Sequence, residues 1–334
     1  MMKYDLEKIW ALLEGGIEPA ESSHNRVYRR LDSDKETGIR LGVVTPGKVR
    51  EILVQIDRKQ QKSFSPPKWT GMRFEIISLD IPKRTPHIRL FLANREHKTV
   101  FSTVCHDMVN TLLKVRAPAL RGEELQNCIE RWSSFFRKYG AEGLSPEMQR
   151  GLFGELTWLE LLLSRNMNAT AAVKSWKGCR RNFHDFQYGD RVVEVKTTIR
   201  KEPRKVRINN ERQLDNRGFS SLYLFILTLQ KLESGGRTLP GLVDEIRDVI
   251  GNDRSAENLF EIALRDAGFL DAHVSLYTDG YRIIKQEIFD VKSGFPRVIE
   301  VPKGVGDIAY TVTVSACSDF ELKFDDAVDN FVGT

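Results

Sequence analysis

The sequence predicts an α/β protein with a smaller, mostly β domain at its N-terminus. Short apolar and alternating runs, separated by Pro, Gly and charged turns, fill positions 38–92, which is typical of strands. Helical periodicity takes over near Phe101 and continues to about Arg165. Strand-like and helix-like segments then alternate to the end of the chain. We therefore expect a mostly β domain of unknown role over residues 1–100 and an α/β domain, with a helical lead-in, over residues 101–334.

The composition suits a soluble globular protein. Of the 334 residues, 41% are apolar and 29% charged. No apolar run of about 18 residues or more is present, so we expect no transmembrane helix and no membrane partner. The N-terminus lacks the apolar core of a signal peptide, and we therefore expect a cytoplasmic location.

Several catalytic classes lose support because their motifs are absent. The sequence has no His-Glu-x-x-His, no Gly-x-x-x-x-Gly-Lys-Ser/Thr and no Gly-x-Ser-x-Gly. Its four cysteines form no Cys-x-x-Cys pair, so we expect free thiols rather than a zinc site or a disulfide framework. These cysteines are Cys105, Cys128, Cys179 and Cys317.

The positive charge is concentrated in one window. Residues 179–217 contain 11 Lys and Arg against 6 Asp and Glu, a net charge of +5, which equals the net charge of the whole chain. A local excess of positive charge suits a polyanionic partner such as DNA. A solvated charged loop is the competing interpretation, above all for residues 200–207.

The N-terminal part begins with an amphipathic segment. Residues 3–14 place Leu6, Ile9, Trp10 and Leu13 on one face of a predicted helix. The strands that we expect after it cover residues 41–44, 51–56, 73–79 and 87–92.

Three helices are predicted next. Apolar positions at helical spacing mark the first from Val104 to Leu113 and the second from Leu125 to Phe136. Ser145 followed by Pro146 is a helix start, and the third helix runs from there to about Arg165. Beyond it we expect strands at 205–208, 222–229, 274–277, 281–289, 297–301 and 308–315, and helices at 210–214, 239–250 and 256–267.

A hairpin with an unusual charge pattern lies between these groups. The pair Gly189-Asp190 is a plausible two-residue loop, because Gly allows a positive φ at its first position. In that register Tyr188 pairs with Arg191, and Asp185 falls opposite Glu194. Directly opposed residues have Cβ atoms about 4.5–5.5 Å apart, and like charges there are destabilising.

Lys196 lies on the same strand face as Glu194, because the two residues are two positions apart. Val193 and Val195 point to the other face, toward a core. A cation such as Mg²⁺ would relieve the repulsion between Asp185 and Glu194 and take oxygen ligands from both. The competing interpretation is a solvated strand face on which Lys196 screens the acids.

Glu155 is a further acid in an apolar setting. It lies among Leu152, Trp158 and other apolar residues of the third helix, where a carboxylate is costly unless it is paired, protonated or bound to metal. A core Arg or Lys could also satisfy it. Gly151 and Gly154 would permit close backbone approach.

Downstream, Asn209 or Asn210 is a good N-cap for a short helix that carries Gln213. Gln213 could hydrogen-bond a phosphate or a bound water, although a lone Gln is more often a surface residue.

Together these short sequence motifs resemble those of the PD-(D/E)xK nuclease superfamily, and within it those of a bacterial family of uncharacterised PD-(D/E)xK motif proteins. The resemblance covers residues 145–315 well and the N-terminal part more loosely. One departure is His184, which stands where the superfamily name has Pro. The matching phrases are Gly151–Leu156, Trp176–Gly178, His184–Phe186, Val193–Thr198 and Glu211–Leu214.

The resemblance implies a restriction-endonuclease-like core, a mixed central sheet flanked by helices. It implies that Asp185, Glu194 and Glu155 bind Mg²⁺ or Mn²⁺, Glu155 directly or through a water. Lys196 would position or deprotonate the attacking water and stabilise charge on the phosphate. Gln213 would orient that phosphate. Basic residues expected to contact DNA are Arg200, Lys201, Arg204, Lys205, Arg207 and Arg212.

The function expected is that of a metal-dependent DNA endonuclease, in the setting of bacterial restriction or anti-phage defence. The resemblance also suggests partner subunits such as a helicase-like ATPase or a methyltransferase, and a possible homodimer. The alternative is a DNA-binding or scaffold subunit that keeps the fold and is catalytically silent.

Overall fold

The computed structural model describes residues 4–16, 21–23, 25–31, 38–79, 85–115, 120–178, 183–199 and 202–333. The chain forms two compact units, Met1–Glu142 and Gly143–Thr334. The boundary predicted after residue 100 falls inside helix α3 (Lys98–Lys114), which packs on α4 (Arg121–Tyr139) in the first unit. The predicted division into domains stays a prediction, since compactness alone does not show that either part folds by itself.

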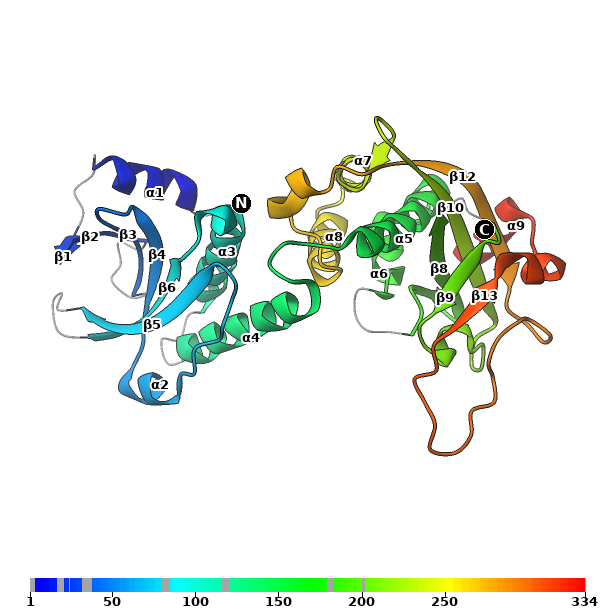
Figure 1. Cartoon of the computed structure of the whole chain (residues 1–334), viewed down its shortest axis with the longest axis horizontal. Helices are drawn as coiled ribbons and strands as arrows, with labels where there is room; N and C mark the ends of the chain where they lie inside the picture. Colours follow the sequence, from blue (N-terminus) through cyan, green and yellow to red (C-terminus); the bar gives the residue numbers. More distant parts are fainter. Residues whose placement is uncertain are drawn as a thin grey trace. The chain divides into compact units, whose positions relative to one another are not determined.

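The N-terminal unit is built on an antiparallel sheet (Figure 1). Its strand order is β1-β2-β3-β4-β6-β5, and all neighbouring strands are antiparallel. The four strands predicted from the sequence are β3, β4, β5 and β6. The bounds are β1 (Glu21–Ser23), β2 (Arg26–Arg30), β3 (Ile39–Val44), β4 (Val49–Gln55), β5 (Met72–Leu79) and β6 (Thr85–Leu92).

Helix α1 (Leu6–Gly15) confirms the amphipathic segment. Its buried residues are the four that the periodicity selected, Leu6, Ile9, Trp10 and Leu13. Asp5 caps its start by accepting a hydrogen bond from the backbone N–H of Lys8. Short helices α2 (Arg58–Ser63) and η1 (Arg95–His97) complete the unit.

The C-terminal unit contains a mixed five-stranded sheet, as expected. Its order is β11-β12-β10-β8-β7, with β8 and β10 parallel and the other neighbours antiparallel. Strands β9 and β13 form a separate antiparallel pair. The bounds are β7 (Phe186–Tyr188), β8 (Arg191–Ile199), β9 (Lys205–Ile208), β10 (Ser221–Leu232), β11 (Arg237–Thr238), β12 (Gly280–Asp290) and β13 (Tyr310–Thr313).

Both faces of this sheet are covered. On one face, the ring of Trp158 from α5 (Pro146–Ser164) lies 5.0 Å from Phe225 of β10 and 5.7 Å from Phe331 of α9 (Phe324–Val332). On the other face, Leu224 packs in one apolar cluster with residues of β9 and β13, including Val206. Burial on both faces explains why β10 is a continuous apolar run rather than an alternating one.

Helix α5 approaches β8 closely. Ser145 caps it by accepting from the N–H of Met148, and Pro146 is its first residue, as predicted. A Cβ on Gly154 would lie 2.4 Å from Cγ2 of Thr197, so a side chain there would force the helix away from the strand. Gly151 is different, because a Cβ there would meet nothing within 4 Å.

The remaining helices lie around this core. Helices α6 (Ala169–Ser175), α7 (Leu239–Ile250) and α8 (Arg254–Asp266) pack near α5 (Figure 1). The sequence predicted α7 and α8, but not α6 or α9. Short helices are η4 (Glu211–Leu214), η5 (Asp271–Leu276) and η6 (Val314–Phe320). Among the described residues, no helix combines the length and apolar character that crossing a membrane requires.

Two strand predictions are wrong. Residues 274–276 belong to η5, with Tyr277 as its C-cap, and residues 297–301 form neither strand nor helix. Arg297 explains the second difference in part: its guanidinium donates to the carbonyl of Leu214, 2.5 Å away, and to the side chain of Asn216, which ties this segment to η4 rather than to a strand.

Candidate active site

The hairpin register agrees with the prediction, and Asp185 lies at its end. Tyr188 pairs with Arg191, but the ladder stops at Phe186, one residue after Asp185. The side chain of Asp185 continues the pairing instead, since its Oδ2 accepts a hydrogen bond of 2.8 Å from the N–H of Val195. Its backbone carbonyl accepts from the N–H groups of Lys177 and Gly178. Asp185 is thus fixed from two sides.

Glu194 is a fully buried carboxylate in the middle of β8. Its exposed fraction is 0%, and its register partner on β10 is the apolar Leu224. Its Oε1 lies 2.6 Å from Nζ of Lys196, whereas its Oε2 has no hydrogen-bond partner among the described residues. Burial, reinforced by the neighbouring charge of Asp185, raises the pKa of Glu194 well above its ordinary value.

Lys196 is the cation at the centre of this acidic group. Burial alone would lower its pKa, but the charges of Glu194 and Asp185 outweigh that effect, so the pKa is raised and the ammonium stays charged. Its Nζ also donates to Oε1 of Gln213 at 3.3 Å, and the same oxygen accepts from the N–H of Asn209 at 2.8 Å. Gln213 therefore holds Lys196, a contact that the sequence did not predict.

The short helix that carries Gln213 forms as expected. It is the 3₁₀-helix η4, and Asn210 caps it by accepting from the N–H of Arg212. The phosphate contact expected of Gln213 stays a prediction.

Glu155 reaches the same place from α5. It is half-buried, and its Oε2 accepts a hydrogen bond of 2.6 Å from the indole N–H of Trp176. A Cβ on Gly178 would lie 2.7 Å from Oδ1 of Asp185 and 3.0 Å from Oε2 of Glu155. The two carboxylates therefore face a common space that exists because residue 178 has no side chain.

Trp176 and Gly178 were not assigned a role from the sequence. The signal that could have found them is the Trp176-Lys177-Gly178 motif, which precedes the hairpin in the sequence.

A pocket of about 520 Å³ brings these groups together. Four of the five predicted site residues line it: Glu155, Asp185, Lys196 and Gln213. Glu194 lies beneath this surface, in contact with Lys196. Lining residues that the sequence did not single out for this site are Ser145, Glu147, Met148, Arg150, Gly151, Val195, Thr197, Thr198, Ile199 and Asn209.

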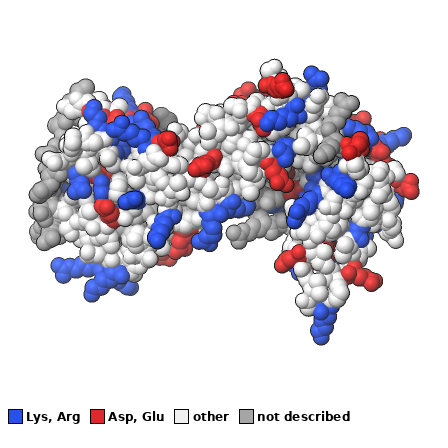
Figure 2. Space-filling view, viewed as in Figure 1, with Lys and Arg blue, Asp and Glu red and all other residues white. Residues whose placement is uncertain are grey.

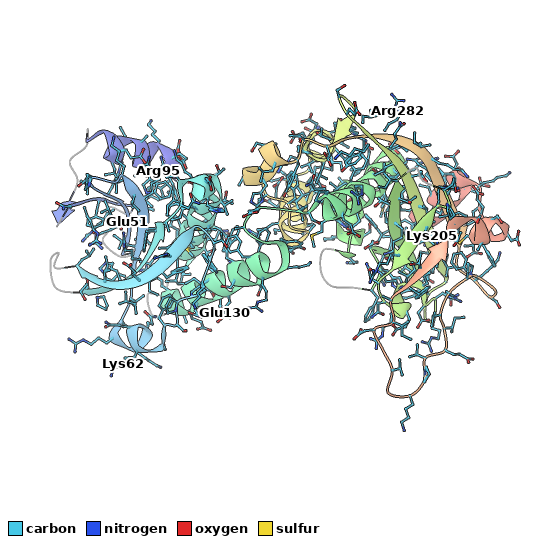
Figure 3. The ribbon with its side chains drawn as sticks, in the orientation of Figure 1. Glu51, Lys62, Arg95, Glu130, Lys205 and Arg282 are labelled. Atoms are coloured by element: carbon cyan, nitrogen blue, oxygen red, sulfur yellow. The ribbon has the colours of Figure 1, made fainter. Side chains whose placement is uncertain are left out.

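The basic residues predicted to contact DNA fall into different settings. Arg207 lines the pocket, and Lys205 is exposed on β9 (Figure 3). The Arg204 guanidinium is instead paired with the buried Glu287. Figure 2 shows Lys and Arg side chains over the region of β9 and β13. Arg200 and Lys201 lie outside the described residues.

Arg212 makes a different kind of contact. Its guanidinium carbon lies 4.9 Å from the centre of the Phe183 ring, a cation–π arrangement. Both side chains are exposed, so they form a polar and aromatic surface, and Phe183 precedes Asp185 by two residues.

The residues suit a hard divalent cation in three respects. Glu194 Oε2 is a buried oxygen without a hydrogen bond in the described residues, the space beside Gly178 adjoins two further carboxylates, and all candidate ligands are oxygens. No group of three or more His, Cys, Asp and Glu side chains in the described part of the chain is arranged so that it could hold a metal ion. Mg²⁺, however, usually binds through one or two carboxylates, with waters and substrate phosphate completing its shell.

Comparison with known protein families finds a match over most of the chain. The model of a family described as "Putative PD-(D/E)XK family member (DUF4420)" matches residues 6–315. No curated protein and no solved structure is significantly similar to the chain.

Proposed function

The chain belongs to DUF4420, the family with that description, and on this premise we propose that it is a metal-dependent DNA endonuclease that hydrolyses phosphodiester bonds. The observation that carries the proposal is the cluster of three acids around one lysine. Folding alone gains little from placing Glu155, Asp185 and Glu194 so close together, because each pair of like charges is repulsive.

Asp185 and Glu194 are the residues that would hold Mg²⁺ or Mn²⁺, with Glu155 completing the site directly or through a water. When bound, such a cation would polarise the phosphate and lower the pKa of an attacking water. Glu194 is the strongest candidate to lose a proton on binding, since burial and the charge of Asp185 raise its pKa.

Lys196 would stabilise negative charge that develops on the phosphate. Its raised pKa keeps it protonated, which favours this role over that of a general base. Gln213 would orient the ammonium through the hydrogen bond that its Oε1 accepts. Trp176 would likewise orient Glu155.

Arg207 and Lys205 are the cations best placed to contact the DNA backbone. Arg207 lines the pocket and Lys205 is exposed on the same strand, β9. A setting in bacterial restriction or anti-phage defence, partner subunits and a homodimer are part of the proposal and rest on the resemblance of the site phrases alone.

The test is cleavage of plasmid DNA with Mg²⁺ or Mn²⁺ by the full chain and three variants. We expect Asp185→Asn and Lys196→Met to lower the cleavage rate by at least about 10²–10³-fold. The matched control is Asp190→Asn, which neutralises an exposed acid in the loop of the same hairpin, and it should cleave like the wild type.

Two outcomes would contradict the proposal. Equal cleavage by all four proteins would identify a contaminating nuclease. DNA binding by all four without cleavage at any cation concentration would favour the silent DNA-binding or scaffold subunit.

A further inference from the structure

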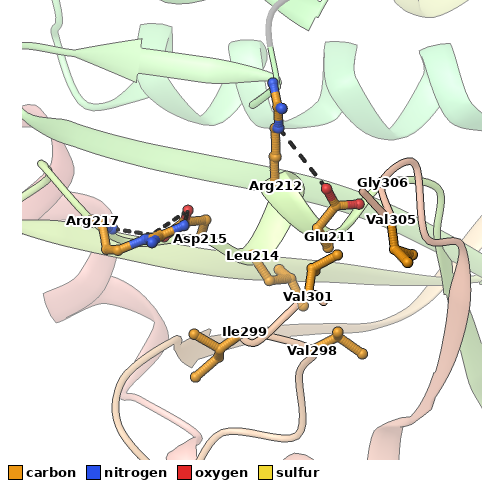
Figure 4. A pocket seen from close by; sticks show the side chains of 10 residues that line it. All are labelled: Glu211, Arg212, Leu214, Asp215, Arg217, Val298, Ile299, Val301, Val305 and Gly306. Atoms are coloured by element: carbon orange, nitrogen blue, oxygen red, sulfur yellow. Dashed lines mark hydrogen bonds and ion pairs between the residues drawn. The ribbon is translucent and has the colours of Figure 1, made fainter. Parts of the chain in front are cut away.

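A second pocket, of about 330 Å³, lies beside η4 (Figure 4). One side is formed by η4 and the residues after it, which contribute four charged side chains. The opposite side is apolar and comes from the loop between β12 and β13. The charged residues are Glu211, Arg212, Asp215 and Arg217, and the apolar ones Val298, Ile299, Val301 and Val305.

The loop that forms this pocket is long but held in place. Residues 291–309 contain no helix or strand, and loops longer than about 12–15 residues in compact domains usually have a function. Asn210 donates a hydrogen bond to Asp307, and Glu211 accepts one from the N–H of Ile308, each 2.9 Å long. Together with the contact of Arg297 to Leu214, these bonds fix the loop against η4.

The two pockets lie on either side of η4. Gln213 lines the catalytic pocket, whereas its neighbours Arg212 and Leu214 line the second one. Consecutive Cα atoms are about 3.8 Å apart, so residues that line the two pockets are direct neighbours in the chain and only η4 separates the pockets. A nucleic acid strand with one phosphate in the catalytic pocket would therefore carry its next nucleotide across η4.

The chemistry of the second pocket matches a nucleotide better than a purely apolar ligand. Its valine and isoleucine side can cover the flat face of a base, and its volume exceeds that of a single base. At the rim, the Arg212 side chain is 60% exposed, so it can reach phosphate, whereas the Arg217 guanidinium, 77% exposed, is paired with Asp215. Phe183, which is 48% exposed beneath Arg212, offers a ring on which a neighbouring base can stack.

We propose that the pocket between η4 and residues 291–309 receives one unstacked nucleobase of the DNA strand whose phosphate lies in the catalytic pocket. The proposal rests on the proposed nuclease function for the position of that strand. Removing a base from the stack costs a few kcal/mol, and least in single-stranded or damaged DNA. Burial of the base against the valines would offset that cost. The pocket would therefore favour DNA in which a base leaves the stack easily, such as single-stranded or damaged DNA.

The test fills the pocket without touching the catalytic residues. Gly306 lines the pocket, and a Cβ there would meet no atom within 4 Å, so Gly306→Trp should be accommodated and occupy the space. The matched control is Pro302→Trp, an exposed position of the same loop that does not line the pocket. Neither substitution changes the charge.

Binding is measured in EDTA to single-stranded oligonucleotides that contain 2-aminopurine, whose fluorescence reports stacking, and to a wholly abasic oligonucleotide of the same length. We expect the wild type and Pro302→Trp to bind the base-containing strand about tenfold more tightly than the abasic one. Gly306→Trp should lose most of that difference and most of the fluorescence change, because only stacking on Phe183 remains.

Equal binding of the abasic strand by the wild type, or unchanged binding by Gly306→Trp, would overturn the pocket proposal and leave the nuclease proposal intact. Conversely, base-dependent binding by a protein that cleaves nothing with Mg²⁺ or Mn²⁺ would support the pocket proposal and count against the nuclease.

Discussion

Two glutamates, each fully buried in a central strand, show the difference between a structural charge and a candidate catalytic one. Glu51 of β4, labelled in Figure 3, lies 2.5 Å from Nε of Arg89 and 3.8 Å from Nε of Arg26. Glu194 of β8 has one cation, Lys196, and two further acids nearby. Glu51 thus faces two arginines, one of which also pairs with Glu75, whereas Glu194 shares one lysine with two other acids.

The balance of charge, rather than burial, separates the two sites. Burial raises the pKa of both carboxyls, but the arginines oppose this at Glu51, whereas Asp185 reinforces it at Glu194. A buried acid matched by arginines is explained by the fold. A buried acid crowded by other acids calls for an additional cation, and the proposed function supplies one.

The largest effects should come from neutralising each glutamate in turn. Glu51→Gln leaves Arg89 and Arg26 without a buried counter-charge, so we expect the free energy of unfolding to fall by about 3 kcal/mol. Cleavage of DNA by the variant that remains folded should be unchanged. Urea denaturation and a cleavage assay measure the two quantities.

Glu194→Gln should behave in the opposite way. It removes repulsion with Asp185, so stability should stay the same or rise, while cleavage should fall by about 10²–10³-fold. If Glu194→Gln instead destabilised the protein as much as Glu51→Gln, the charge at Glu194 would be structural and the contrast between the two sites would fail.

A smaller effect is expected where α5 meets β8. Gly154→Ala places a methyl group against Thr197 and should cost about 1–3 kcal/mol of stability through overpacking. Gly151→Ala, in the same helix with open space around it, should be neutral or stabilise by up to about 1 kcal/mol. Thermal denaturation of both variants measures these changes in stability. Equal changes would show that the close approach at Gly154 contributes nothing to stability.

The smallest effect is a difference in pH dependence. The raised pKa of Glu194 means that the folded chain keeps a proton that the unfolded chain has lost, so this group lowers stability as pH rises above about 4.5. His87 has the reverse sign: burial, aided by Arg40, lowers its pKa to about 4, so stability falls as pH drops below 6.5.

Each of these groups can change the slope of the free energy of unfolding against pH by at most about 1.4 kcal/mol per pH unit. Urea titrations between pH 4 and 7 of the wild type, Glu194→Gln and His87→Gln measure it. At each pH, the free energy of unfolding of each variant is subtracted from that of the wild type. The two differences should change with pH in opposite directions, and a change in the same direction would contradict the assignment.

Much of the fold could be predicted because local signals agreed with one another. The Gly189-Asp190 loop set the hairpin register, and Ser145 with Pro146 set the start of α5. The alternation of apolar residues located four strands of the N-terminal sheet. Helix α9 has buried apolar residues at helical spacing, Ala327, Val328 and Phe331, which the prediction missed. The segment 297–301 is held by side-chain contacts of Arg297 to Leu214 and Asn216, which periodicity does not reveal.

The candidate site could be predicted in its members but not in all of its contacts. Spacing on a strand is enough to bring Glu194 beside Lys196. The hydrogen bond from Lys196 to Gln213 depends on how η4 returns to β8, and the space between Glu155 and Asp185 depends on the backbone at Gly178. Contacts between segments that are distant in the sequence produce no periodic pattern of residues from which they could be predicted.

The double attachment of Asp185 affects how inactive variants should be interpreted. Its carboxylate takes the place of a backbone hydrogen-bond acceptor at the end of the hairpin. Asp185→Ala would therefore loosen the edge of the sheet and remove the charge in one step. A loss of function would then have two causes. Asp185→Asn keeps an oxygen that can accept from Val195 and removes only the charge, so only this substitution separates chemistry from architecture.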